Sequence, residues 1–146
     1  MVKKMNEIEM LNYIYQTSKI GIINIDNIKS EIKNKNFLKN LQAQQNSYFE
    51  ICNEATDFLF LVNKEREEIS NITKVMIYID SRINTMNDNS LSNIIKLLIS
   101  KSTERIIDLE NKINDYNLKN KKILSLCKKL LRLEKSNIEK NKKYLK

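Results

Sequence analysis

The chain of 146 residues contains no proline, no histidine and no tryptophan, and its only glycine is Gly21. Sheets and tight turns usually depend on Gly and Pro, so their scarcity favours an all-helical fold. Without His, neither Ser-His nor Cys-His catalysis can operate. A single glycine is also too few for a Gly-rich phosphate-binding loop. The composition therefore excludes these nucleophilic enzymes and the P-loop proteins.

Cysteine and long apolar runs are also scarce. The two cysteines, Cys52 and Cys127, lack the CxxC spacing of redox or zinc sites, and we expect both to be reduced, half-buried core residues. The longest apolar runs, such as residues 58–62, fall far below the ~20 residues that span a bilayer. The charged N-terminus is not followed by an apolar segment, which argues against a signal peptide. We therefore expect a cytoplasmic protein without a membrane span.

Lys, Asn and Ile dominate the composition, with 22 Lys, 21 Asn and 22 Ile. Such a bias is typical of proteins from AT-rich genomes, so a single Lys or Asn is weak evidence of function. The formal net charge is +8, and residues 119–146 hold ten Lys and one Arg against two Glu. All the excess positive charge therefore lies in the last segment. Part of it has a simple role, because basic groups near a helix C-terminus complement the helix dipole.

Apolar residues recur at steps of three and four along five segments, which predicts five amphipathic helices. We place these helices at about residues 5–33, 37–64, 68–86, 91–116 and 121–144. The fourth has the clearest stripe, made of Leu91, Ile95, Leu98, Ile106, Leu109 and Ile113. We expect Ile106 and Leu109 at the centre of the core. Residues 33–36 are the expected first turn, and Ser90 is the expected N-cap of the fourth helix.

An internal repeat links the first and fourth helices. The segment SKIGIINIDNI, residues 18–28, aligns with STERIIDLENK, residues 102–112, so that Ser18 matches Ser102. This overlap indicates a duplicated helical hairpin and a single domain covering residues 1–146. Short turns make antiparallel neighbours, and a helix of about 20 residues reaches ~30 Å, enough to return the chain along the bundle. The predicted architecture is an all-α, ferritin-like four-helix bundle with a helical crossover between the second and third long helices.

Three segments carry a resemblance to known proteins. They are LNYIYQTSKIGIINID near the start, ISKSTERIIDLENKI in the fourth helix and LLRLEKSNIEKNKKYL at the end. Their pattern resembles a group of uncharacterised ferritin-like proteins of low-GC Gram-positive bacteria. The likeness covers almost the whole chain, but it is a pattern of helical positions and carries no catalytic fingerprint. Some ferritin-like proteins of spore-forming bacteria are coat components, so the resemblance implies a spore-associated location as one alternative.

The di-metal ligands of ferritin-like proteins are incomplete here. Such proteins place a Glu on each of two helices and Glu-x-x-His on each of the other two. The nearest match is Glu134 with Asn137, where Asn replaces His, and an amide nitrogen has no lone pair for a metal. The repeat partner on the second helix, shifted by 86 residues, is Tyr48 with Ile51. We therefore expect no metal, no cofactor and no enzymatic activity.

The same positions have a structural interpretation. Buried polar groups are usually satisfied internally, and together they can fix how helices align. A shifted reading through residues 54–57 or Glu104 does not bring the acidic groups onto inward faces. We therefore predict a buried polar layer that sets the helix register, composed of Ser18, Ser102, Glu134 and Asn137.

The preferred functional interpretation is a non-catalytic helical module that has lost the di-metal site and binds a protein partner or self-associates. A degenerate di-metal enzyme is one alternative. Nucleic-acid binding through the last helix is another, with phosphate contacts from Lys128, Lys129, Arg132, Lys135, Lys140, Lys142 and Lys143. It is the weaker alternative, because aromatics and Arg are scarce in that helix and charge runs commonly face water.

Overall fold

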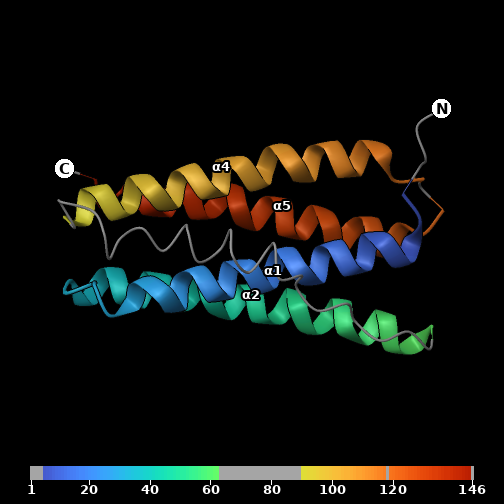
Figure 1. Cartoon of the computed structure of the whole chain (residues 1–146), viewed down its shortest axis with the longest axis horizontal. Helices are drawn as coiled ribbons and strands as arrows, with labels where there is room; N and C mark the ends of the chain where they lie inside the picture. The colour runs from blue at the N-terminus through green and yellow to red at the C-terminus, as the bar shows by residue number, and fades with distance from the viewer. Residues whose placement is uncertain (1–4, 63–89, 118, 146) are drawn as a thin grey trace.

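The computed structural model describes residues 5–62, 90–117 and 119–145, and its regular structure there is helical. Four long helices form a bundle (Figure 1): α1 (Glu7–Lys29), α2 (Lys35–Leu61), α4 (Leu91–Asp115) and α5 (Lys121–Lys142). The described residues contain no strand, only an isolated bridge between Met5 and Tyr116. Within the same residues, no helix is long and apolar enough to cross a membrane. The helix expected at 68–86 lies outside the described residues.

Asparagine and serine side chains cap the N-termini of the helices, in a chain that has almost no Gly or Pro to mark the helix ends. Asn6, Asn34, Ser90 and Asn120 each accept a hydrogen bond from a backbone N–H two or three residues further on, at 2.8–3.3 Å. Each cap satisfies a donor that the first helical turn leaves free. The expected cap at Ser90 is confirmed. The expected first turn is wrong in its second half, because Asn34 caps α2 and the helix begins at Lys35.

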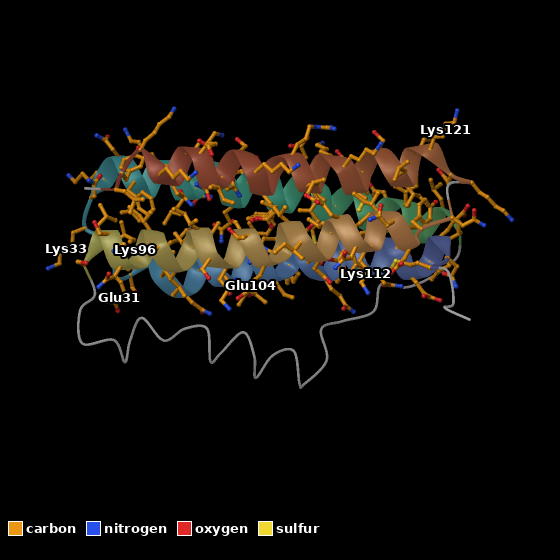
Figure 2. The ribbon with its side chains drawn as sticks, turned by 90° about the horizontal axis from the view of Figure 1, so that it is seen from above. Glu31, Lys33, Lys96, Glu104, Lys112 and Lys121 are labelled. Carbon is orange, nitrogen blue, oxygen red and sulfur yellow. The ribbon has the colours of Figure 1, made fainter. Side chains whose placement is uncertain are left out.

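The helices form two antiparallel hairpins that pack side by side. α1 packs on α2, α4 packs on α5, and the hairpins meet mainly through α2 and α5. The two hairpin turns lie at opposite ends of the bundle, as the positions of Lys33 and Lys121 show in Figure 2. In Figure 1, α2 and α4 therefore run in the same direction, and α4 begins at the end of the bundle opposite to the one where α2 ends.

The core follows the predicted apolar stripe of α4 only in part. Ile95, Leu98 and Leu109 are buried, but Leu91, Ile106 and Ile113 are only partly buried. The centre of the buried face passes through Leu98, Ser102 and Leu109, and at about 100° per residue Ile106 falls to one side of it. The placement of Ile106 at the centre of the core was therefore wrong. Neither cysteine forms a disulfide, and both are buried, deeper than the half-buried state expected of them.

Candidate functional site

Polar side chains from three helices meet inside the bundle, near the middle of each helix. Glu134 of α5 is the only charged side chain among the described residues that is buried completely. The hydroxyls of Tyr48 on α2 and Ser102 on α4 donate to Glu134 Oε1 at 2.6 and 3.1 Å. Nε of Arg105 on α4 donates to Glu134 Oε2 at 2.6 Å. Three donors and one positive charge together offset the cost of removing this carboxylate from water.

Burial and the neighbouring charges determine the protonation states of Tyr48 and Arg105. Burial by itself would lower the pKa of Arg105, but the adjacent Glu134 carboxylate outweighs it and the pKa is raised. Burial, and then the charge of Glu134, raise the pKa of Tyr48. Tyr48 therefore stays protonated and remains a donor, and Arg105 stays charged. Neither Tyr48 nor Arg105 therefore changes its protonation state near neutral pH.

The single glycine of the chain makes room for the Tyr48 ring. A Cβ atom on Gly21 of α1 would lie 2.6 Å from Tyr48 Cζ and 2.7 Å from its Cε1 and Cε2 atoms. Real Cβ atoms do not approach other carbons so closely, so only glycine fits under the ring. Gly within a helix costs about 1 kcal/mol relative to Ala. This cost is offset by letting Tyr48 pass over α1 and reach Glu134.

The four residues predicted for the polar layer are all buried, but they do not all bond to one another. Ser102 and Glu134 are joined directly. Asn137 donates from Nδ2 to the Tyr48 hydroxyl at 3.2 Å, and not to a serine or to Glu134. The Ser18 hydroxyl donates to the carbonyl of Ile14 in its own helix at 2.8 Å. Ser18 therefore borders the network without a bond to its other members.

Sequence reasoning missed Arg105 and the role of Gly21, although the repeat contains a signal for both. The offset of 84 residues that matches Ser18 with Ser102 also matches Gly21 with Arg105. Tyr48 is bonded to Glu134, which lies 86 residues further along, at the equivalent place in the second hairpin. Each hairpin thus pairs a long polar side chain with a suitable residue on its other helix. In the first hairpin the ring of Tyr48 requires Gly21, the smallest residue, and in the second the carboxylate of Glu134 requires the cation of Arg105.

The candidate phosphate contacts of α5 do not form one surface. Lys129 is paired with two glutamates of α2 at 3.3 and 2.8 Å, and Lys142 is paired with Glu139 at 3.3 Å. Lys128, Arg132 and Lys135 instead line a groove on the α4 side of the helix. The last two candidates, Lys140 and Lys143, are exposed towards the end of α5. The positive charge is therefore divided among several faces of α5.

Within the described residues, no group of three or more His, Cys, Asp or Glu side chains is placed to hold a metal ion. Glu104, the alternative acidic position, is exposed and pairs with Lys101 on the outer face of α4 at 3.2 Å (Figure 2). In comparisons with protein families, curated proteins and solved structures, no match to the chain was found. What the buried site can do is therefore argued from its geometry.

The Asn137→Leu substitution is expected to change the free energy of unfolding by less than about 1 kcal/mol. It removes one hydrogen bond to Tyr48, worth ~1 kcal/mol, but also removes a buried oxygen whose lack of a partner costs ~1–3 kcal/mol. That oxygen, Oδ1, has no hydrogen-bond partner among the described residues. The Tyr48 hydroxyl would keep its bond to Glu134. Urea denaturation of the variant measures the difference.

Asn141→Leu is the matched control, because both asparagines are 1% exposed and lie on the same face of α5. Asn141 Oδ1 accepts from Asn40 at 2.9 Å and from Gln44 at 2.7 Å. Its removal strands two donors, so we expect a loss of about 1–3 kcal/mol. Equal losses in the two variants would show that Asn137 is a required member of the layer, contrary to this prediction.

Proposed function

We propose that this chain is a ferritin-like helical bundle without catalytic chemistry, which acts as a protein-interaction or structural module. The observation that carries the proposal is the ion pair of Glu134 with Arg105 at the middle of the bundle. The direction of the helices supports the ferritin-like part, because a parallel α2 and α4 require a connection that crosses the bundle. The hydrogen bonds that occupy both oxygens of Glu134 support the non-catalytic part.

A di-metal site needs carboxylates that are free to bind cations. Both oxygens of Glu134 already accept hydrogen bonds, and one of them touches a guanidinium. A cation that bound there would displace the guanidinium of Arg105 from Glu134 and so break the buried ion pair. The same contacts serve a structural purpose, because they join α2, α4 and α5 at one level. Because the centre of the bundle serves to fix the helix register, we expect the functional contacts to be made by its surface.

Elemental analysis of the protein, expressed with iron and manganese in excess, tests the non-catalytic part. We expect less than about a tenth of an equivalent of either metal, because a site of one carboxylate and one guanidinium does not meet the ligand needs of these ions. The Glu134→Gln variant is the control: it would empty a site built on this residue but leave surface-bound ions unchanged. A full equivalent in the wild type that Glu134→Gln removes would overturn the proposal.

Native mass spectrometry, together with a pull-down from the native host, tests the interaction part. The expected result is a defined oligomer or a stoichiometric complex with another protein. A strictly monomeric protein with no co-isolated partner would contradict it. A cytoplasmic location, or association with spores, belongs to the same proposal and is followed by fractionating the host.

A further inference from the structure

An open groove runs between α4 and α5 on the outside of the bundle. Its volume is about 350 Å³, and it is lined by Glu110, Ile113, Asn114, Lys128, Leu131, Arg132 and Lys135. Ile113 and Leu131 are partly buried and pack against the core, so they give the groove an apolar floor. The charged residues stand on its rims. The groove therefore combines apolar and charged surface, as sites that receive amphipathic helices do.

The cations of the groove are only weakly neutralised by the residues that the structure describes. Lys128 and Arg132 have no ion-pair partner among the described residues. Lys135 has only a distant one, Glu110, at 3.8 Å, and both of these side chains are more than half exposed. The three cations follow one another at spacings of four and three residues, so they line up over ~10 Å of α5. Lys129, by contrast, faces two glutamates at hydrogen-bond distance.

We infer that this groove binds an acidic amphipathic helix of a partner protein. The partner's apolar side chains would lie on Ile113 and Leu131, and its Asp or Glu side chains would face the cations of α5. The inference rests on the proposed interaction function and names its surface and the chemistry of its partner. Helices dock into apolar grooves through residues spaced by three, four and seven positions. Acidic residues with this spacing match the positions of Lys128, Arg132 and Lys135.

Other anionic ligands fit the groove less well. A small anion would meet only one or two of the three cations, because they spread over ~10 Å. A nucleic-acid backbone would meet the carboxylate of Glu110 on the opposite rim and would gain nothing from an apolar floor.

The test uses the full chain and a fluorescent synthetic peptide, an amphipathic helix with Leu on one face and Glu on its flanks. Fluorescence anisotropy measures binding to the wild type, to Lys128→Glu/Arg132→Glu and to Lys122→Glu/Lys140→Glu. The second double variant makes the same charge change on the same helix, outside the groove. We expect binding to weaken at least tenfold in the groove variant and by less than about twofold in the control. All four residues are exposed, so both variants should fold.

Three results would overturn the inference. Absence of peptide binding to the wild type would do so, as would equal losses in the two double variants, which would indicate general charge attraction. So would binding of a single-stranded polynucleotide that Lys128→Glu/Arg132→Glu abolishes, because the groove would then serve phosphates. The proposed function fails by a different measurement, namely a monomer without partners or a metal held by Glu134. The two failures are therefore distinguishable.

Discussion

The Arg105→Met substitution is expected to lower the free energy of unfolding at pH 7 by about 3–5 kcal/mol, the usual cost of removing one partner from a buried ion pair. Met preserves much of the apolar stem of Arg but cannot neutralise Glu134. The carboxylate would keep its bonds to Tyr48 and Ser102, yet it would remain charged inside the bundle. Urea denaturation followed by circular dichroism measures the loss. A change below about 1 kcal/mol would place Arg105 among ordinary surface ion pairs.

Two further measurements separate a stranded charge from lost packing. Arg105→Met/Glu134→Gln should recover most of the stability, because removing both partners of a buried pair is often nearly neutral. The pH dependence gives the second test. In Arg105→Met the buried carboxyl favours its neutral form, so the folded state binds a proton more readily than the unfolded state. The variant should then gain stability relative to the wild type as the pH falls from 7 towards 4. A pH-independent difference would indicate packing alone.

The helices were predictable because their signals are local. Steps of three and four along α4, and an N-cap such as Ser90, depend on neighbours within one or two turns. The parallel course of α2 and α4 follows from the short hairpin turns and the long segment between them. The burial of Ser102, Glu134 and Asn137 could also be predicted from the sequence, because each of these residues interrupts an apolar stripe.

The partners inside the polar layer were not predictable from periodicity. Periodicity places a residue on a face, but it does not say how far a long side chain reaches. Arg105 lies on the buried face, three residues after Ser102 and four before Leu109, and its flexible stem carries the guanidinium to Glu134 with 14% of the side chain still exposed. A second buried contact, in which Asn40 and Gln44 donate to Asn141, was also not predicted. Asparagine is so abundant in this chain that the sequence does not distinguish Asn141 from the asparagines on the surface. Such contacts depend on residues about a hundred positions apart.

Gly21→Ala is expected to destabilise the protein by about 2–4 kcal/mol, even though Ala is the better helix former. Helix propensity alone would stabilise the variant by ~1 kcal/mol. Against this, the new Cβ would lie 2.6 Å from the Tyr48 ring, and overpacking of this kind costs ~1–3 kcal/mol. The ring cannot turn away freely, because its hydroxyl is bonded to Glu134 at 2.6 Å. Displacing it would also leave the buried carboxylate short of a donor, at ~1–3 kcal/mol.

The Gly21→Ala/Tyr48→Leu variant tests this mechanism. Leu is smaller than the ring, so the added Cβ would find space, and the loss should fall short of the sum of the two single losses by more than ~1 kcal/mol. Ser18→Ala is the matched control on the same helix. Because Ser18 bonds only within α1, we expect it to change stability by less than about 1 kcal/mol. If Gly21→Ala instead raised the midpoint of urea denaturation, helix propensity would outweigh the contact, and Tyr48 would not be held over α1 as the structure indicates.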